Sequence, residues 1–538
     1  MELGEQYNVD FIDLDYEGRG VCKLESNFPI FVPNALKGER GKIEITEIKK
    51  NFGQAKLIKL YEKSPYRVAP KCPYYDQCGG CNLMHLDYNA SLEYKTKLVK
   101  DTVRRIASIT PNVLPCVGME NNFYYRNKLE FHFSFNNQKI RAGFYNEKTH
   151  TVVDIDSCLN EPSIATDIIR FLKSIFKILG VPIYKEKDNR GCVRHVIIRM
   201  NQKNEIMVIF VTNTHYLKKD QEIIEALTNK FKNIKSIALS FQPANNNVHI
   251  GEKTTILWGK EYLEEELLGI KYNISPESFF QVNHTQTERL YLKVLEYAKL
   301  TGKENVIDAY CGIGSISLCL AKSANHVYGI EIIEKAVENA RLNAIENKIK
   351  NTTFIYGPCE EAISDLVDKK DIDLLVVDPP RKGMDKKFIE AIGPMKIKKI
   401  IYVSCNIRTM SRDLVYLSEY GYEVNEITPF DMFPNTTHVE TVVCLSRKKV
   451  NDRINFDINI EALPDRVSKT ATYAEIKAYV LEHYGFKVSS LYIAQIKDKH
   501  GIKERENYNI GEGKSKELIC PPEKEEAITN ALKHFNMI

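Results

Sequence analysis

The first half of the chain contains two different patterns of apolar and polar residues. In residues 1–62, short apolar runs such as 20–24 and 42–45 are broken by glycine and proline, which predicts a small β-barrel. Residues 63–270 mix a helical pattern at 92–106 with apolar strand patterns, which predicts a central α/β domain.

Between residues 271 and 449, the pattern predicts strands that alternate with loops and helices. The segments 305–309, 327–331, 374–378 and 399–404 are continuous apolar runs. Such runs are typical of strands in a sheet that helices cover on both faces. This part therefore predicts a Rossmann-like domain, and the chain as a whole a multidomain α/β protein.

Residues 450–538 carry helical signals of their own. A capping box at Thr472-Tyr473-Ala474-Glu475 precedes the first of three predicted helices, and the others lie at 490–501 and 522–535. A winged-helix fragment and a general three-helix module both fit. We expect a small helical extension and leave its role open.

Composition narrows the class of protein. Apolar residues make up 43% and charged residues 27% of the 538 residues, as in ordinary globular proteins. We find no run of eighteen apolar residues, and the first fifteen residues are acidic, so we expect neither a membrane span nor a signal peptide. The expected location is the cytoplasm.

Net charge is only +4, so charge distribution says more about partners. Residues 37–63 hold eight Lys or Arg and four Glu. Such a segment either forms a basic face that contacts phosphates or is a solvated face of mixed charge.

A glycine turn follows the first strand of the Rossmann-like domain. Gly312 and Gly314 stand between a strand and a helix, and Glu331 ends the next strand, 19 residues beyond Gly312. An acid at this distance can bind two ribose hydroxyls. Because the third glycine of the dinucleotide pattern is missing, an adenosine nucleoside such as S-adenosylmethionine fits better than NAD.

Asp378 ends a further strand and is followed by Pro-Pro-Arg. An acid before two prolines makes a rigid corner at the carboxyl edge of the sheet, where such folds bind ligands. With an aromatic residue after the prolines this motif often serves amine methylation. Arg381 stands there instead, which argues against an exocyclic amine as the target.

Cys405 ends the next strand in Ser-Cys-Asn and should reach the same crevice. A thiolate that adds to C6 of a pyrimidine activates C5 toward a methyl donor, and a base must then remove the C5 proton. Glu440 is the first candidate for that base, and His438 is the second. Taken singly, a cysteine is more often structural than catalytic.

In this order the motifs resemble the RNA 5-methyluridine (uracil-C5) methyltransferase family, in its iron–sulfur and TRAM-containing 23S rRNA type. The segments that carry the resemblance are 280–283, 308–315, 378–383, 404–406 and 438–440. The first 62 residues resemble its TRAM domain, an OB-like RNA-binding barrel.

The resemblance implies roles for individual residues. Cys405 is expected to be the nucleophile and Glu440 the base, and Gln281, Tyr310, Glu331 and Asp378 are expected to line the S-adenosylmethionine site together with the glycine turn.

The segment that contains Arg126, Asn127 and Lys128 resembles one that lies near the RNA. Basic and amide side chains suit contacts with phosphates and bases. A plain strand-edge surface is the alternative for these three residues.

Cys72, Cys78 and Cys81 lie in a loop rich in proline and glycine. Three thiolates and a fourth ligand can bind a [4Fe–4S] cluster or Zn²⁺, and the spacing alone does not separate them. The family resemblance implies the cluster, with Cys158 as fourth ligand, in a structural or RNA-positioning role. A reduced loop without metal is the alternative.

We expect an RNA substrate and a monomeric enzyme. The resemblance favours 23S rRNA, and tRNA is the second candidate. A non-catalytic RNA-binding factor is a further alternative, against which the intact Cys405 and Glu440 argue. The Ser-Cys-Asn and Asp-Pro-Pro-Arg motifs argue against a 5-methylcytosine enzyme.

Overall fold

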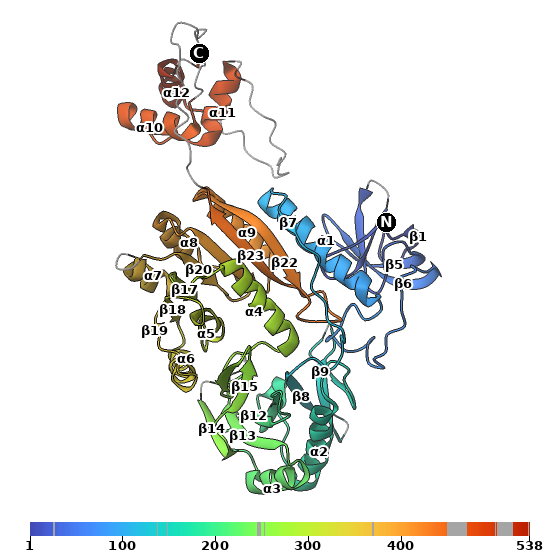
Figure 1. Cartoon of the computed structure of the whole chain (residues 1–538). Helices are drawn as coiled ribbons and strands as arrows, with labels where there is room; N and C mark the ends of the chain where they lie inside the picture. The colour runs from blue at the N-terminus through green and yellow to red at the C-terminus, as the bar shows by residue number, and fades with distance from the viewer. Residues whose placement is uncertain are drawn as a thin grey trace. The chain divides into compact units, whose positions relative to one another are not determined.

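The computed structural model describes residues 1–24, 27–136, 138–147, 149–244, 249–251, 253–367, 371–448, 471–500, 502, 520–535 and 537–538. The chain forms two compact units, Met1–Lys449 and Val450–Ile538. Three large sheets follow one another along the first unit (Figure 1).

The first sheet forms a small β-module around a core that includes Phe11, Cys22, Ile30 and Ile43. Its strand order is β1-β5-β6-β4-β3-β2. The strands predicted at 20–24 and 42–45 are confirmed as β3 and β5. The strands are β1 Gln6–Asp10, β2 Asp13–Leu14, β3 Gly20–Lys23, β4 Pro29–Val32, β5 Arg40–Ile48 and β6 Gly53–Glu62.

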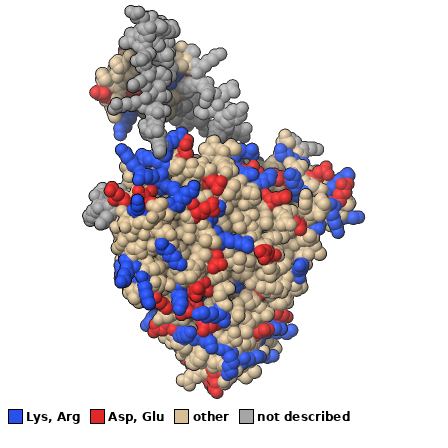
Figure 2. Space-filling view, viewed as in Figure 1, with Lys and Arg blue, Asp and Glu red and all other residues tan. Residues whose placement is uncertain are grey.

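Charge on this module is mixed. Three of the eight basic residues of the segment 37–63 pair with acids of the module: Arg40 with Glu62, Lys49 with Glu47 and Lys56 with Glu44. On the face of the molecule that Figure 2 shows, basic and acidic side chains are interspersed.

Helix α1, Tyr88–Ala107, follows a loop and begins earlier than predicted. The reason is Asp87, whose side chain accepts hydrogen bonds from the backbone N–H groups of Asn89 and Ala90 and so caps the helix. The apolar residues Val99 and Val103 of α1 pack into the core of the third sheet.

The second sheet has the order β10-β9-β8-β11-β12-β13-β14. Helices α2 and α3 cover one of its faces, and Phe131, Leu172, Phe210 and Leu227 meet in the core between them. Its elements are β8 Lys128–Asn136, β9 Lys139–Tyr145, β10 Val152–Asp154, α2 Ser163–Leu179, the 3-10 helix Glu186–Asp188, β11 Val193–Met200, β12 Ile206–Thr212, α3 Asp220–Lys230, β13 Ile234–Phe241 and β14 Lys253–Gly259. A two-stranded ribbon follows, β15 Leu263–Leu267 and β16 Ile270–Ile274.

The third sheet has the order β19-β18-β17-β20-β21-β23-β22-β7. Strands β17 to β21 are parallel, and β23 is antiparallel to β21 and β22. Its strands are β7 Asn112–Val113, β17 Asn305–Ala309, β18 His326–Glu331, β19 Thr352–Tyr356, β20 Leu374–Val377, β21 Lys399–Ser404, β22 Tyr422–Phe430 and β23 Glu440–Arg447. Its helices are α4 His284–Ala298, α5 Ser315–Ala321, α6 Glu334–Glu346, α7 Cys359–Val367, α8 Lys386–Ile392, the 3-10 helix Gly393–Met395 and α9 Ile407–Glu419.

Successive residues of these strands point to opposite faces of the sheet. On β17, Val306 packs with α4, α5 and α6, whereas Ile307 packs with α1, α7, α8 and α9. The same alternation holds at Ile400 and Ile401 of β21. Burial on both faces explains why these strands are continuous apolar runs.

The second unit contains α10 Tyr473–Tyr484, α11 Ser490–Lys499 and α12 Pro522–His534. The predicted capping box is present, with Thr472 and Glu475 each bonding the other's backbone N–H. The three predicted helices are therefore confirmed, and they pack around a core that includes Ile476, Ile493 and Ile528.

Candidate active site

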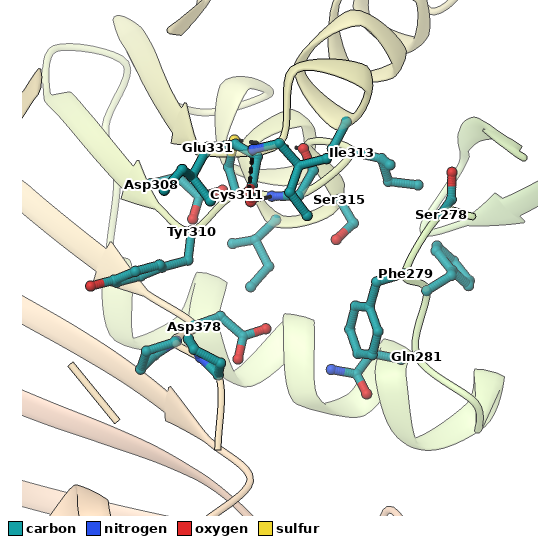
Figure 3. A pocket seen from close by; sticks show the side chains of 18 of the residues that line it. Ser278, Phe279, Gln281, Asp308, Tyr310, Cys311, Ile313, Ser315, Glu331 and Asp378 are labelled. Carbon is teal, nitrogen blue, oxygen red and sulfur yellow. Dashed lines mark hydrogen bonds between the residues drawn. The ribbon is translucent and has the colours of Figure 1, made fainter. Parts of the chain in front are cut away.

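The glycine turn after β17 is held in place by Glu331. Tyr310, Gly312 and Gly314 all have positive φ angles, of 65°, 56° and 79°. One carboxylate oxygen of Glu331 accepts a hydrogen bond of 3.0 Å from the Gly312 N–H, and the other accepts one of 2.9 Å from the Ile333 N–H. The turn and the end of β18 thus form one rigid wall, seen in Figure 3.

A cavity of about 630 Å³ lies against this wall. In Figure 3, Tyr310 and Asp378 lie on one side of an open space, with Phe279 and Gln281 across from them. The cavity brings together every predicted catalytic and cofactor residue except Gly314, which lies in the turn behind it. Those lining residues are Gln281, Tyr310, Gly312, Glu331, Asp378, Cys405 and Glu440.

Sequence reasoning missed several lining residues. Phe279, Ile332 and Ile333 line the cavity and are 60–68% exposed, which is unusual for large apolar side chains. Arg381 of the Asp-Pro-Pro-Arg motif and His438, the second candidate for the base, were singled out in the sequence and line it as well. Ile332 and Ile333 directly follow Glu331 in the sequence. This apolar pair after the acid at the strand end could have indicated that both residues line the cavity.

The carboxyl edge of the third sheet places Cys405, Glu440 and Asp378 together. Strand β23 runs antiparallel to β21 with Thr441 opposite Ser404, so Glu440 stands opposite Cys405, the residue after β21. Asp378 directly follows β20, the parallel neighbour of β21. Glu440 is the first residue of β23 and pairs with Phe430 of β22.

Burial and mutual repulsion raise the pKa of all three acidic groups. Burial, and then the charge of Asp378, raises the pKa of Glu440 to about 8, against a lowering by Arg381. Burial, followed by Glu440 and Asp378, raises the pKa of the Cys405 thiol to about 12. Burial, and then Asp308, raises the pKa of Asp378 to about 7. The Cys405 thiol is therefore largely protonated near pH 7 when the site holds nothing else.

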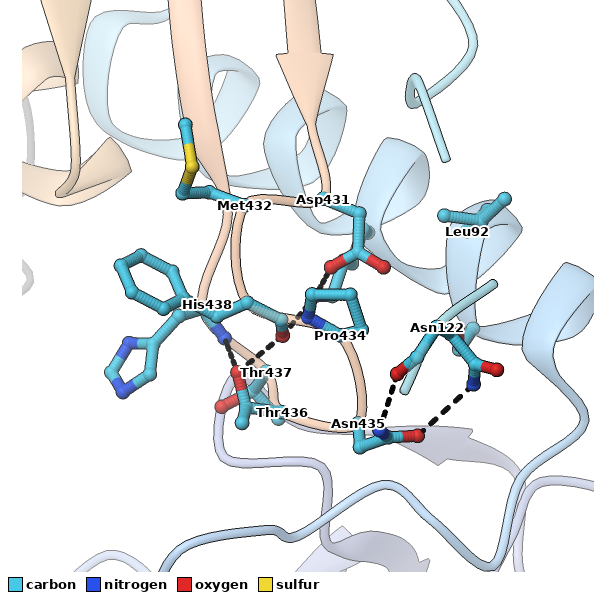
Figure 4. Close-up of polar contacts among 12 residues, drawn as sticks. Leu92, Asn122, Asp431, Met432, Pro434, Asn435, Thr436, Thr437 and His438 are labelled. Carbon is cyan, nitrogen blue, oxygen red and sulfur yellow. Dashed lines mark hydrogen bonds and ion pairs between the residues drawn. The ribbon is translucent and has the colours of Figure 1, made fainter. Parts of the chain in front are cut away.

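The loop between β22 and β23 leads directly into Glu440 and is anchored by polar contacts (Figure 4). Asp431 is fully buried, pairs with Lys95 of α1 and accepts a hydrogen bond of 2.8 Å from the Tyr88 hydroxyl. Asn435 exchanges hydrogen bonds with Asn122, at 3.0 and 3.2 Å. His438 lies at the cavity end of this loop, and burial followed by Arg381 lowers its pKa.

Arg126, Asn127 and Lys128 do not line the cavity. The Asn127 side chain donates to the Gln281 carbonyl at 3.2 Å, and its backbone N–H donates to Val282 at 2.8 Å. The predicted RNA contact of this segment stays a prediction; its observed contacts hold the Gln281 segment in place.

The four predicted metal-binding cysteines lie close together. Burial raises the pKa of Cys81 to about 12, and the neighbouring Cys78 and Cys72 raise it further. Burial also raises the pKa of Cys158, with Cys81 and Cys78 among the smaller causes. The Asn160 amide donates to the Cys81 sulfur at 3.1 Å.

Within the part of the chain that the structure describes, no helix is long and apolar enough to cross a membrane.

A Rossmann-like sheet with a glycine turn, a ribose-type acid and a cavity at the carboxyl edge defines an S-adenosylmethionine-dependent methyltransferase. Residues 87–448 match the family described as tRNA (Uracil-5-)-methyltransferase, and residues 1–58 match the TRAM domain. The chain belongs to this family of RNA methyltransferases. The predicted family, the TRAM domain and the enzyme class are thus confirmed.

Related proteins agree with this assignment. An "Uncharacterized RNA methyltransferase" of Bacillus cereus is 45% identical over 450 residues, which are 83% of this chain and 98% of that protein. One of Caldanaerobacter subterraneus is 42% identical, covering 83% and 99%. The solved structure of the Pyrococcus abyssi tRNA (uracil-54, C5)-methyltransferase with S-adenosyl-L-homocysteine is 31% identical, with a TM-score of 0.65, covering 82% of this chain and 100% of that one.

Proposed function

We propose that this enzyme methylates C5 of a uridine in RNA through a covalent bond between Cys405 and C6. The observation that carries the proposal is the pairing of β21 with β23, which sets Cys405 opposite Glu440 in the wall of the cofactor cavity. A nucleophile and a base at the same sheet edge are what this chemistry requires.

The Cys405 thiol first releases its proton to solvent; the thiolate sulfur then forms a bond to C6, and the electrons of the C5–C6 double bond shift toward C5 and the O4 carbonyl. When bound, S-adenosylmethionine would supply the methyl group for C5; the bond between its sulfur and that methyl group breaks, and S-adenosylhomocysteine remains. Glu440 takes the C5 proton, the C–H electron pair restores the double bond, and the thiolate leaves C6. Only the carboxylate form of Glu440 can take this proton; with a pKa of about 8 this form is the minor one near pH 7, and its share grows as the pH rises toward 8.

The residues around the cavity fit S-adenosylmethionine. Both oxygens of Glu331 are already oriented by backbone N–H groups and keep lone pairs for ribose hydroxyls. Phe279 and Ile332 offer exposed apolar surface for the adenine ring. Asp378 and Gln281 are the polar groups available to the methionine part.

The covalent step is tested with RNA that contains 5-fluorouridine. Fluorine at C5 cannot be removed as a proton, so the wild type should form a denaturant-resistant adduct with the RNA. Cys405→Ala should form none and lose methyl transfer by roughly 10³-fold or more. Glu440→Gln should transfer one methyl group to ordinary RNA and stay attached to it, because the C5 proton is not removed.

Cys444→Ala is the matched control, since this half-buried thiol lies on β23 outside the cavity lining. It should keep full activity and form the adduct. Retained methyl transfer by Cys405→Ala, or an adduct that maps to another residue, would overturn the covalent mechanism.

We also propose that Cys72, Cys78, Cys81 and Cys158 hold a [4Fe–4S] cluster. The proposal rests on the resemblance to the iron–sulfur type of the family. It is supported by the proximity of the four thiols, since Cys72 and Cys78 act on the pKa of Cys81, and Cys78 and Cys81 act on that of Cys158. Donors such as the Asn160 amide to the Cys81 sulfur are typical of cluster surroundings.

Anaerobically purified protein should contain about four iron and four sulfide per chain. Cys81→Ser should lose most of the iron and the visible absorption of the cluster, and Cys444→Ser should lose neither. Zinc without sulfide in the wild-type protein is the result that would refute the cluster.

We favour 23S rRNA as the substrate, because the combination of a TRAM domain with these cysteines resembles the large-subunit type. The second candidate is tRNA. It is favoured by the likeness to the Pyrococcus abyssi enzyme, whose substrate is given as tRNA.

A further inference from the structure

The second sheet carries a group of polar side chains on the face that α2 and α3 leave free. On β8, Leu129, Phe131 and Phe133 pack toward these helices. Because side chains alternate along a strand, Glu130 and His132 point to the opposite face. Strand β11 pairs with β8 so that His195 stands directly opposite His132.

Glu130 lies at the centre of this group. One of its carboxylate oxygens lies 3.2 Å from His195 Nε2 and 3.7 Å from His132 Nε2. Its other oxygen lies 2.8 Å from Nδ1 of His249, which comes from the segment before β14. In the part of the chain that the structure describes, Glu130, His132 and His195 form the one group of three or more such side chains whose ligand atoms all lie within 4.8 Å.

These separations match those of a tetrahedral zinc site. Imidazole nitrogens and carboxylate oxygens bind Zn²⁺ at about 2.0–2.2 Å, which places neighbouring ligand atoms roughly 3.3–3.6 Å apart. Two histidines and one carboxylate make a common zinc ligand set. The fourth position is open to His249 or to water.

We propose that Glu130, His132 and His195 bind a divalent transition metal of the zinc class, with water or His249 at the fourth position. The site is separate from the four cysteines in both residues and chemistry, since it offers nitrogen and oxygen atoms only. It also does not depend on the function proposed for Cys405.

The surroundings of the site are suitable for binding. The side chains of Glu130, His132 and His195 are 19%, 17% and 7% exposed, whereas His249 is 69% exposed, so an ion can enter from the His249 side. The ring of Tyr145 stacks on His132 at 4.0 Å and fixes its orientation. Lys128 lies near Glu130 and His249.

Binding requires one local rearrangement. His195 Nε2 lies 2.7 Å from the His249 carbonyl, so in the metal-free protein it carries the proton and donates it there. When Nε2 binds a metal, the proton moves to Nδ1 and the carbonyl loses this bond. The bound ion would then connect β8, β11 and the segment before β14, which are far apart in sequence.

The test is titration of the purified full-length protein with Co²⁺, a spectroscopic substitute for Zn²⁺. The histidine site should give visible d–d bands of tetrahedral cobalt without a sulfur-to-cobalt charge-transfer band, which separates it from cysteine ligation. His132→Gln/His195→Gln should weaken Co²⁺ binding at least tenfold and abolish the rise in Tm that Zn²⁺ causes. The matched control is His150→Ala, a 67% exposed histidine nearby that is not a proposed ligand.

If the double variant does not fold, Glu130→Gln and His132→Gln should each weaken binding by a smaller factor. Equal Co²⁺ affinity in these variants and in wild type, or bands that show sulfur ligation only, would overturn the proposal. Loss of the bands would leave the methyl-transfer tests of Cys405 unaffected, so the two proposals fail independently.

Discussion

At the scale of single residues, several acidic side chains are buried close together at the site, where the charged form of each is unfavourable. Burial raises the pKa of Glu440 to about 8 and those of Asp378 and Asp308 to about 7. Each pKa lies above its ordinary value, so the folded protein retains protons that the unfolded chain has already released. Stability is therefore lost as the pH rises from about 4.5, the ordinary pKa of a glutamate, toward 8.

Replacing Glu440 by glutamine should remove part of this loss. We expect the free energy of unfolding of Glu440→Gln to exceed that of wild type by at least about 1 kcal/mol at pH 8.5 and by much less at pH 4.5. The variant should therefore unfold at a higher temperature at pH 8.5. Thermal unfolding at several pH values measures this difference.

Glu423→Gln is the control for this experiment, because that side chain is exposed and pairs only at the surface with Lys448. It should change little at either pH. A stability gain of Glu440→Gln that is equal at both pH values would contradict the raised pKa.

At the scale of elements, helix α1 anchors the loop that carries the proposed base. Lys95 is 1% exposed and pairs with Asp431 at the end of β22. The Gln286 side chain of α4 donates a hydrogen bond of 3.1 Å to the Asp431 carbonyl. Asn435, further along the loop, contacts Asn160, which in turn donates to the Cys81 sulfur. The loop therefore contacts both α1 and the cysteine site.

Lys95→Met should leave the Asp431 carboxylate buried without its partner. We expect a loss of about 3–5 kcal/mol in the free energy of unfolding, together with weaker methyl transfer, because the loop before Glu440 loses its anchor. Denaturant unfolding and methyl-transfer assays measure the two effects.

The double variant Lys95→Met/Asp431→Asn should recover much of this stability, since no unpaired charge remains buried. Lys97→Met is the matched control on the same helix; its exposed pairs with Asp13 and Asp101 are worth about 1 kcal/mol or less. A loss in Lys95→Met no greater than in Lys97→Met would rule out the anchoring role.

At the scale of the whole molecule, the TRAM domain lies beside the catalytic edge. The Arg408 guanidinium of α9, three residues after Cys405, stacks 3.5 Å above the Tyr16 ring, and Lys97 of α1 pairs with Asp13. RNA that brings a flipped-out uridine to Cys405 would therefore pass close to the first sheet.

Cells that lack this enzyme should lose 5-methyluridine at one or more positions of 23S rRNA. Wild-type and Cys444→Ala genes should restore the methyl group, and Cys405→Ala should not. Mapping of modified nucleotides in rRNA and tRNA measures this. Loss confined to tRNA would reverse the substrate preference, and no loss at all would contradict the proposed activity in those cells.

Much of the fold was predictable because its signals are local. Strands β17 and β21 follow from apolar runs, the turn at Gly312 from its glycines, and the second unit's first helix from its Thr472 capping box. These features depend on backbone preferences and burial within a few residues. The order of the motifs was also enough to indicate the family.

Long-range pairing decided the rest. Glu440 stands opposite Cys405 because β23 turns back antiparallel on β21, and α1 packs on the third sheet although it lies far from it in sequence. The histidine group exists because β8 and β11 pair in one register; a shift by one residue would turn His195 to the other face. The sequence by itself determined which groups can react, and the tertiary structure decided which of them meet, because register and packing join segments whose local patterns carry no information about one another.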